Sequence, residues 1–492
     1  MQNVEKIVMR RAIVLWMLNA CFGLVMLGLL NMSGNSAVGW AQSDLPTATL
    51  LPTQTPTPNL PPSPTVGPLV TPRSYFATPQ TSPGSIDEAS GLPVPTHAAT
   101  YQATREYAML NILLVGHDSE SDGQAGGGFR TDTLIVVNIN RTAGTVSMLS
   151  LPRDLYVYVP DWRFVRINTV WDRGMAVYGG NDGGFRLMKE TVWYNYALEL
   201  HYYAMIDFSG FKRIIDTLGG IYIAVDCPIE DYRWTGTYDE NGDPVFELVT
   251  IPVGWQYMDS ITALMYARSR RNSNDFDRGR RQQQIIRAIY HSARNQGLLA
   301  NIPQLYSDIT SIVETNIPLE VFLQLAPIGL ALQPTSIESH FLYVGRDTQG
   351  YTTASGAAVQ IPTERFFETI NAFLTPPTQN RLVAEGALIG IFDSSGMGKR
   401  WDVVAADRLL WEGLNSMPLG EATPPPNIDI SEQSIIIDYT GNSKGNSVAT
   451  LARILNIDDA HIYTVPNPDR TVDYAVYISP SYHACYNRQV IE

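Results

Sequence analysis

The chain has few cysteines, fewer basic than acidic residues, and none of the common zinc or nucleotide motifs. The three cysteines, Cys21, Cys227 and Cys485, lack the Cys-x-x-Cys spacing of zinc sites. Lysine and arginine number 34 against 48 acidic residues, giving a formal charge of −14 at pH 7. Such a balance excludes the broadly basic surface that nucleic-acid binding requires. Any anion-binding site must therefore be a local group of basic residues.

Two further absences limit the kinds of binding site that the sequence predicts. The Gly-rich segment 119–129 lacks the Gly-Lys-Ser/Thr ending of a P-loop. His117 has no second histidine or cysteine nearby and is interpreted as structural. A disulfide between Cys227 and Cys485 would join two different domains, and the sequence does not predict it.

One long apolar run lies at the N-terminus. Residues 12–32 are apolar and, at about 20 residues, long enough to cross a bilayer as a single helix. The basic residues in segment 1–11 predict that this tail is cytoplasmic and that the rest of the chain is extracytoplasmic. The alternative is a signal peptide cleaved near Gly39-Trp40-Ala41.

Residues 33–104 are rich in proline, threonine and serine, as in the stretch 52–58. This composition cannot bury enough apolar surface to fold, and proline keeps it extended. We interpret the segment as a spacer between the membrane and a folded domain.

Three apolar runs after the spacer predict neighbouring β-strands. They are residues 111–115, 133–139 and 145–149. In an up-down-up meander, Asp118 after the first strand, Asp132 before the second and Arg153 after the third would lie at the same end of the sheet. Facing carboxylates repel unless a cation neutralises them. Mg²⁺ accepts one or two carboxylates together with phosphate oxygens of a substrate. The convergence of Asp118 and Asp132 at one end of the sheet therefore predicts a site for Mg²⁺ (or Mn²⁺). Each aspartate alone would be interpreted as ordinary surface charge.

Arginines are concentrated between residues 268 and 294, where eight occur with no lysine and two aspartates. The planar fork of arginine matches phosphate oxygens two at a time. Asp259 is predicted to cap a helix over 261–267. The segment predicts a phosphate-binding site in an otherwise acidic protein.

A second helix is predicted over residues 276–295, and its periodicity sorts these arginines. Arg278 and Gln282 share a stripe with two isoleucines that face the core, and Arg281 flanks it. Buried-edge arginines need partners, which Asp275 and a bound anion could supply. The opposite face is predicted to be solvated and carries Arg280, Arg287 and Arg294.

The C-terminal third repeats one pattern: a strand, an Asp-x-Ser/Thr-Gly loop, and a helix. The loops are Asp393-Ser-Ser-Gly396 and Asp438-Tyr-Thr-Gly441. Residues 384–480 are thus predicted to form a small α/β domain with an internal repeat, followed by the tail 481–492. Glycine loops at helix starts can bind phosphate, but an architectural role is favoured here.

Together these motifs resemble the LytR-CpsA-Psr family from residue 111 to the middle 370s. The motifs are Gly116-x-Asp118, Arg130-Thr-Asp132, Ser150-Leu-Pro-Arg153-Asp154, Ile167-Asn168, the run from Ile215 to Gly220, and the run from Ala267 to Gln282. The resemblance implies a mixed sheet flanked by helices, an α/β/α sandwich over residues 105–375, with an apolar tunnel for a polyprenyl tail. The C-terminal domain resembles one appended to some family members.

The resemblance also implies an activity: transfer of a glycopolymer from a polyprenyl-pyrophosphate carrier to a wall acceptor, typically peptidoglycan. Asp118 and Asp132 would hold the metal ion, and these two with Arg153 and Arg278 are the predicted catalytic residues. Asp275 would orient the arginines around the pyrophosphate. The predicted pyrophosphate contacts are Arg130, Arg153, Arg268, Arg270, Asp275, Arg278, Arg281 and Gln282. Glu120 departs from the arginine common in the family, which removes a phosphate contact or changes the entrance polarity.

Two alternatives stay open. Water could replace the acceptor, making the protein a polyprenyl-pyrophosphate pyrophosphatase, or the arginines could grip an anionic polymer in a non-catalytic, regulatory wall protein. A binder of that kind needs arginines but not two converging carboxylates. Asp132 and Asp154 are the candidates for a general base, although Asp154 is better explained as a turn cap.

Overall fold

The computed structural model of the chain describes residues 84–87, 90–95, 108–117, 131–298, 301–376, 385–426, 428–441, 443 and 447–485. All of them belong to one compact unit, Pro72–Glu492. The predicted anchor 12–32, Asp118, Glu120 and Arg130 lie outside the described residues. Within the described ranges, no helix has both the length and the apolar character needed to span a bilayer.

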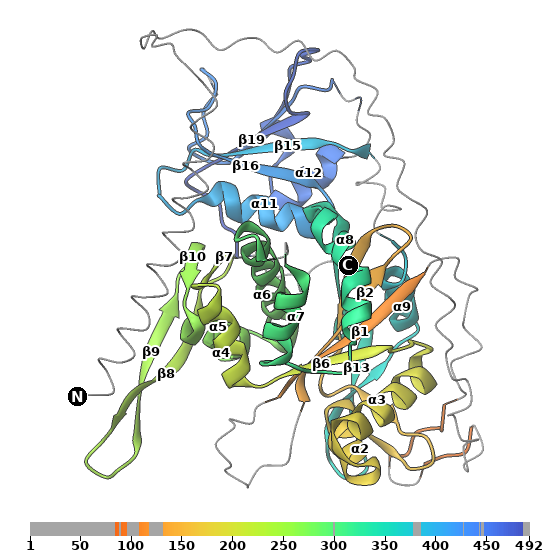
Figure 1. Ribbon diagram of the computed structural model, residues 1–492. Helices are drawn as coiled ribbons and strands as arrows, with labels where there is room; N and C mark the ends of the chain where they lie inside the picture. Colours follow the sequence, from red (N-terminus) through yellow and green to blue (C-terminus); the bar gives the residue numbers. More distant parts are fainter. Residues whose placement is uncertain are drawn as a thin grey trace, which may run out of the picture. The chain divides into compact units, whose positions relative to one another are not determined.

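A six-stranded mixed sheet forms the centre of residues 108–376 (Figure 1). Its strands, in spatial order, are β11 (Glu314–Thr315), β6 (Tyr202–Ile206), β1 (Met109–His117), β2 (Thr131–Asn140), β3 (Thr145–Ser150) and β12 (Ile337–Phe341). β2 pairs antiparallel with both β1 and β3, so the predicted meander is correct. β6 joins β1 and β12 joins β3 in parallel, which confirms the predicted mixed α/β architecture.

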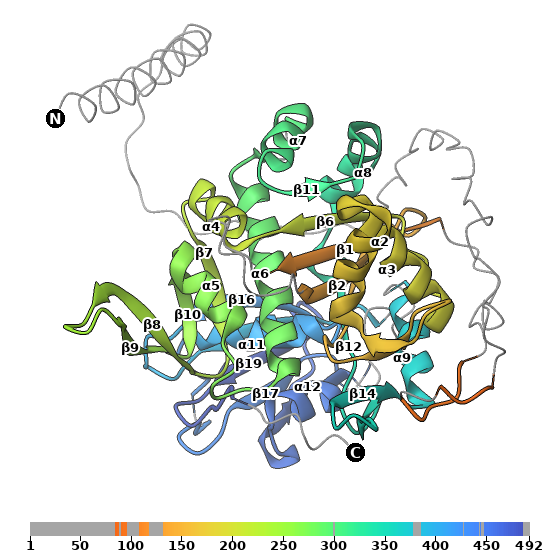
Figure 2. The ribbon, with the colours of Figure 1, turned by 90° about the horizontal axis from the view of Figure 1, so that it is seen from below.

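The two faces of the sheet have different partners, because successive side chains of a strand point to opposite faces. One face buries Leu113 and Val136 against α2 (Val170–Tyr178), α3 (Gly180–Tyr196) and α9 (Arg365–Phe373). The other face, with Leu114 and Ile135, packs against α6 (Asp275–Asn295). Figure 2 shows α2, α3 and α9 on one side of the sheet and α6 on the other.

The remaining elements of this part surround the sheet. The helices are α4 (Phe208–Thr217), α5 (Ser260–Arg268), α7 (Ile302–Thr310) and α8 (Leu319–Ala331). The paired strands are β4 (Tyr156–Tyr158) with β5 (Phe164–Arg166), β7 (Ile221–Val225) with β10 (Gly254–Met258), β8 (Ile229–Tyr238) with β9 (Pro244–Ile251), and β13 (Thr348–Thr352) with β14 (Ala358–Pro362). Short 3-10 helices cover Ile167–Thr169 and Pro334–Ser336, and a third, Asp459–His461, lies in the C-terminal part of the chain.

Side-chain caps start the two helices that carry the arginines. The Asp259 carboxylate accepts a hydrogen bond from the backbone N–H of Thr262 at 2.8 Å, so the predicted cap of α5 is correct. The Asn274 side chain accepts one from the N–H of Asp277 at 2.9 Å at the start of α6. Such caps satisfy N–H groups that have no partner inside the helix.

Residues 385–485, called the C-terminal region below, form a second sheet of five strands. Its elements are β15 (Leu388–Asp393), α11 (Trp401–Trp411), β16 (Asn415–Glu421), β17 (Ile435–Asp438), α12 (Ser447–Leu455), β18 (Ile462–Thr464) and β19 (Tyr474–Ile478). The strand order is β16-β15-β19-β17-β18, with β15–β16 and β17–β18 each parallel. The predicted repeat is therefore two βαβ units on either side of β19.

The loops of the repeat are closed by their own aspartates. The buried Asp393 carboxylate accepts hydrogen bonds from the N–H and hydroxyl of Ser395, at 3.0 and 2.6 Å. Asp438 does the same for Thr440, at 2.7 and 2.6 Å. Because these groups serve the turns themselves, the loops have an architectural role in the structure.

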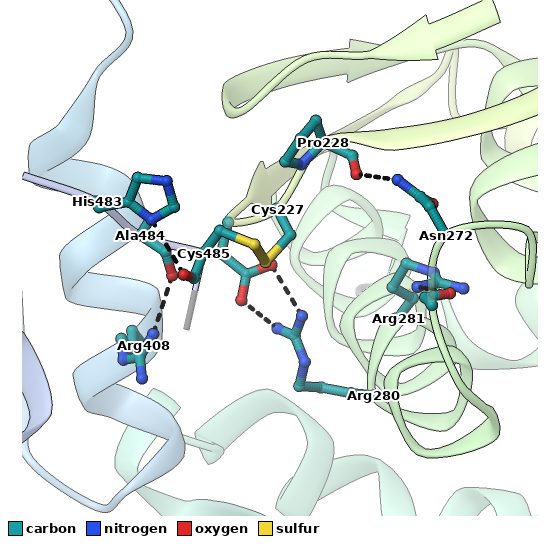
Figure 3. The surroundings of a disulfide bond; sticks show 11 residues. Cys227, Pro228, Asn272, Arg280, Arg281, Arg408, His483, Ala484 and Cys485 are labelled. Carbon is teal, nitrogen blue, oxygen red and sulfur yellow. Dashed lines mark hydrogen bonds and ion pairs between the residues drawn. A yellow bond between two sulfur atoms is a disulfide. The ribbon is translucent and has the colours of Figure 1, made fainter. Parts of the chain in front are cut away.

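The two halves of the folded chain are joined covalently, which the sequence analysis did not predict. Cys227, after β7, forms a disulfide with Cys485, across a sequence separation of 258 residues (Figure 3). The expectation that these cysteines do not pair was wrong. It assumed two independent domains, whereas α11 of the C-terminal region packs against β7 and β10 and contacts α6, and residue 485 lies at the end of β7.

The prediction that Arg280, Arg287 and Arg294 are solvated was wrong for the first two, whereas Arg294 is partly exposed. Arg280 forms a two-point ion pair with Asp226, at 2.7 and 2.8 Å. Arg287 is 8% exposed and donates to the carbonyl oxygen of Ile337 at 2.9 Å. Arg294 donates to a backbone carbonyl at 2.7 Å. Periodicity separated the faces of α6 correctly, but it could not show that both faces are covered.

The disulfide generates a test of stability. Replacing Cys227 and Cys485 with serine is expected to lower the free energy of unfolding by about 2–5 kcal/mol, because the unfolded chain regains the freedom that the cross-link removes. Chemical denaturation of the full chain in detergent, with and without reductant, measures the change. Cys21→Ser is the control and should leave the midpoint unchanged. Equal midpoints for the double variant and the wild type would contradict the cross-link.

Candidate functional site

A cavity of about 1140 Å³ lies between the sheet and helices α4, α5, α6 and α7. Most of its wall is apolar: Leu114, Ile135, Ile206, Phe208, Phe211, Leu264, Ile286, Ile289, Leu305, Ile309 and Phe322. Charged and polar side chains join this wall where β2, α5 and α6 meet: Asp132, Arg268, Arg270, Arg278 and Gln282. Pockets for small ligands usually measure roughly 300–1,000 Å³. The cavity suits a ligand with a large apolar part and an anionic group.

The meander brings Asp132 and Arg153 together, as predicted. The Arg153 Nη1 atom donates to both oxygens of the Asp132 carboxylate, at 3.3 and 3.2 Å. Both side chains keep about a quarter of their surface exposed. Asp118 lies outside the described residues, but it follows His117, which is paired in register with Thr131. The strand register thus places the end of β1 beside the start of β2, next to Asp132.

Three arginines surround one carboxylate, that of Asp275. Its Oδ1 atom lies 3.5 Å from Arg278 and 3.8 Å from Arg270, and its Oδ2 atom lies 3.8 Å from Arg153 Nε. These separations exceed ordinary hydrogen-bond lengths, and the buried Arg153 Nε has no hydrogen-bond partner. The arginines therefore retain donors that an additional anion could use.

Arg278 is the most buried of these arginines, at 7% exposure. Burial lowers the pKa of its guanidinium, Arg270 and Arg153 lower it further, and Asp275 opposes them. An anion bound beside Arg278 would offset both the burial and the like-charge repulsion. Arg268, also on the cavity wall, stacks its guanidinium on the Phe208 ring at 4.2 Å from the ring centre.

Arg281, predicted to contact the ligand, serves the protein instead. It is 1% exposed and donates to the carbonyl oxygens of Tyr266, at 2.8 Å, and Ser269. Its Nη1 atom donates to the Ser273 hydroxyl at 3.1 Å. Arg281 does not line the cavity. It fixes the segment that carries Arg268 and Arg270.

Gln282 lines the cavity as predicted, but its amide nitrogen is engaged. It donates to the Thr133 hydroxyl at 2.9 Å and to the Ala267 carbonyl oxygen at 3.3 Å. Asp154 pairs with Arg166 at 3.2 Å and with Arg153 at 3.6 Å. Its structural role, preferred in the sequence analysis, thus takes the form of ion pairing rather than turn capping.

Several cavity residues were missed. Thr133 lines the cavity and holds Gln282, and the hairpin β8–β9 contributes Tyr232 and Phe246 to the wall. Arg271 stacks on the Tyr232 ring at 4.4 Å, which links the hairpin to the arginine segment. Apolar residues at alternate positions of 229–251 were the available signal, but nothing in the sequence connected them to the cavity.

A divalent ion is compatible with the donor set. Among the described residues, no group of three or more His, Cys, Asp or Glu side chains could hold a metal ion. Mg²⁺ needs only one or two carboxylates when a substrate supplies phosphate oxygens. Asp132 offers one such carboxylate at the polar part of the wall.

Comparisons with known proteins agree on one family. The LytR_cpsA_psr family profile matches residues 84–368, more than half of the chain. The probable cell wall biosynthesis protein LcpB of Corynebacterium glutamicum is 32% identical over 221 residues, which cover 42% of this chain and 48% of that protein. The polyisoprenyl-teichoic acid–peptidoglycan teichoic acid transferase TagU of Oceanobacillus iheyensis is 29% identical, covering 44% and 62%. Regulatory protein MsrR of Staphylococcus aureus is 27% identical, covering 42% and 57%.

The chain therefore spans about half to three-fifths of the length of these relatives. Among solved structures, B. subtilis TagV is similar with a TM-score of 0.42 and 26% identity, covering 55% of this chain and 98% of that one. TagT bound to LIIa-WTA has a TM-score of 0.40 and 21% identity, covering 57% and 94%.

Arg278 generates the first test of the cavity. Arg278→Lys keeps the charge but loses the two-point fork, so we expect roughly 10- to 100-fold weaker binding of farnesyl pyrophosphate, the loss of one charged hydrogen bond or more. Isothermal titration of the full chain in detergent measures it. The exposed Arg365→Lys is the matched control. Equal affinities of the two variants would remove Arg278 from the anion site.

Ile289 provides the second test of the cavity. Ile289→Trp fills part of the apolar wall, so farnesyl pyrophosphate should bind more weakly while inorganic pyrophosphate binds as it does to the wild type. The ratio of the two affinities is the measurement. If both ligands lose affinity equally, the apolar part of the cavity does not hold the prenyl chain.

Proposed function

Because the chain belongs to the LytR-CpsA-Psr family, we propose that it transfers a glycopolymer from a polyprenyl-pyrophosphate carrier to a cell-wall acceptor such as peptidoglycan. One observation carries the proposal: the long apolar wall of the cavity adjoins Arg278, Arg270 and Asp132. A polyprenyl pyrophosphate likewise joins a long apolar chain to an anionic group. The transferase named among the relatives supports the choice of carrier and acceptor.

In the proposed reaction, an acceptor sugar hydroxyl attacks the phosphorus nearest the donor sugar. The new P–O bond forms as the bond to the bridging oxygen breaks, and polyprenyl phosphate leaves with that oxygen. The hydroxyl proton passes to a base, for which Asp132 is a candidate. The product is a phosphodiester between glycopolymer and acceptor.

The side chains at the polar part of the cavity suit this chemistry, because phosphoryl transfer depends mainly on positioning and on neutralising negative charge. Arg278 and Arg270 would bind the pyrophosphate oxygens, and Arg153, paired with Asp132, lies beside them. Asp275 keeps the three guanidinium groups together despite their like charge. Asp132 and Asp118 would hold a Mg²⁺ or Mn²⁺ ion, which supplies further neutralisation when bound.

The proposal includes a location and a division of the chain. Residues 12–32 would anchor the protein in the cell membrane, and 105–375 and 384–480 would be extracytoplasmic domains. The spacer predicted over 33–104 would end earlier, because Val94 is 3% exposed and packs with Tyr158 and Tyr194. The Cys227–Cys485 disulfide supports this location, because disulfides persist in oxidising compartments outside the cytoplasm. An anchored protein would meet its lipid-linked substrate at the membrane surface.

Asp132 provides the test of the reaction. Asp132→Asn is expected to slow transfer roughly 100-fold or more, because a carboxylate that serves the metal ion or the proton is lost. The assay follows release of polyprenyl phosphate and labelling of peptidoglycan by the full chain, with and without added Mg²⁺. The control is Glu368→Gln, which changes an exposed carboxylate on α9.

Three outcomes would decide between the candidate activities. Transfer by Asp132→Asn at the wild-type rate would contradict a metal-assisted transferase. Release of polyprenyl phosphate without labelled acceptor would identify a pyrophosphatase. Binding of the carrier with neither release nor labelling would identify a regulatory binder.

A further inference from the structure

Helix α6 has two functional faces. One face, with Arg278, Gln282 and Ile289, forms part of the cavity wall. The other carries Arg280, Gln284 and Arg287, spaced by four and three residues and so aligned along the helix. A rotation or shift of α6 would move both sets together, so whatever holds the rear face also sets the position of Arg278.

The C-terminal region supplies a buried contact to this rear face. Asp407, on α11, accepts hydrogen bonds from the Gln284 side chain at 3.2 Å and from the Trp411 indole at 3.1 Å. The Trp411 ring also lies against the Arg287 guanidinium, 4.5 Å from its centre. A carboxylate, an amide and a guanidinium thus meet between α11 and α6.

The same contact extends to α5. The Gln284 side-chain oxygen accepts a hydrogen bond from the Tyr266 hydroxyl at 2.8 Å. Tyr266 is 1% exposed, and its carbonyl oxygen accepts from Arg281. Two residues later α5 ends at Arg268, which lines the cavity. One chain of hydrogen bonds therefore runs from Asp407 through Gln284 to both helices that present arginines to the cavity.

A second attachment lies beside the disulfide. Arg280 pairs with Asp226, the neighbour of Cys227, and Arg408 of α11 donates to the Ala484 carbonyl oxygen at 3.1 Å, next to Cys485. Figure 3 shows the disulfide between Arg280 and Arg408. The covalent bond and its two flanking arginines hold the end of the C-terminal region close to the rear face of α6.

We propose that the C-terminal region positions the anion-binding face of α6, and that Asp407 is the positioning residue. Directional hydrogen bonds suit this role better than apolar contacts, which tolerate sliding. Arg287 lies on the facing helix against Trp411, and its charge and that of Asp407 favour each other's ionised form. Removing Asp407 would leave Arg287 buried without that compensation and Gln284 without its acceptor. The proposal rests on the proposed function only in calling the bound anion a pyrophosphate.

The titratable groups at this contact respond to burial in opposite directions. Burial raises the pKa of Asp407, while Arg287, Gln284 and Trp411 act to lower it and the more distant Asp226 adds to the rise. Burial lowers the pKa of Arg287 to about 10, and Asp407 and Glu338 oppose that change. Opposite charge on the partner therefore favours the ionised form of each.

The experiment compares Asp407→Ala with Asp438→Asn in the full chain. Asp438 is a buried carboxylate of the C-terminal region that closes its own loop. We expect Asp407→Ala to weaken binding of farnesyl pyrophosphate roughly tenfold, a typical effect of a small misplacement. It should also speed amide exchange along residues 278–289. Asp438→Asn should lower the melting temperature at least as much without either effect.

Each further outcome has a defined meaning. If the wild type binds no farnesyl pyrophosphate, the proposed function fails, and amide exchange in α6 still tests the positioning role. If Asp407→Ala does not fold, Asp407→Asn takes its place. This variant keeps an acceptor for Gln284 but loses the negative charge, so a smaller change in the same direction is expected. Wild-type exchange and affinity in the folded variant would overturn the proposal, as would identical changes in Asp438→Asn.

Discussion

The orientation of helix α6 about its own axis is the constraint on which the rest of the site depends. At 3.6 residues per turn, Arg278 and Gln282 reach the cavity only while Arg280, Gln284 and Arg287 point the other way. The sheet, α5 and the C-terminal region each bind one side of this helix. An amphipathic helix normally turns a polar face to water, but here the polar face packs against other parts of the protein.

Buried arginines define the electrostatics of a protein that is acidic as a whole. Among the arginines of α6, Arg280 pairs with a carboxylate, Arg281 with backbone carbonyls, and Arg287 with a carbonyl and an indole ring. Arg278 has only a distant share of Asp275. The least compensated of the four is thus the one that faces the cavity, which is how a binding site differs from a structural ion pair.

Local patterns predicted much of this arrangement. The meander, the caps of α5, the inward stripe of α6 and the approach of Asp132 to Arg153 all follow from periods of two and 3.6 residues and from capping chemistry. The errors concern contacts between distant segments. The residues around Arg287 do not indicate its contact with Trp411, and those around Cys227 do not indicate its bond to Cys485. A local pattern shows that a helix face is polar, but not which distant segment covers it. Arg281 illustrates the same limit, since its acceptors are carbonyl groups that every residue possesses.

The link between Cys227 and Cys485 also has a consequence for the order in which the protein matures. Synthesis reaches the cavity-forming helices long before residue 485, since 258 positions separate the two cysteines. Until α11 (Trp401–Trp411) has been synthesised, the rear of α6 lacks its contacts with Asp407 and Trp411. All residues that line the cavity have therefore been synthesised before the C-terminal region can hold them in position. A chain that ends between α6 and α11 would keep Arg268, Arg270 and Arg278 and lose the support that aligns them.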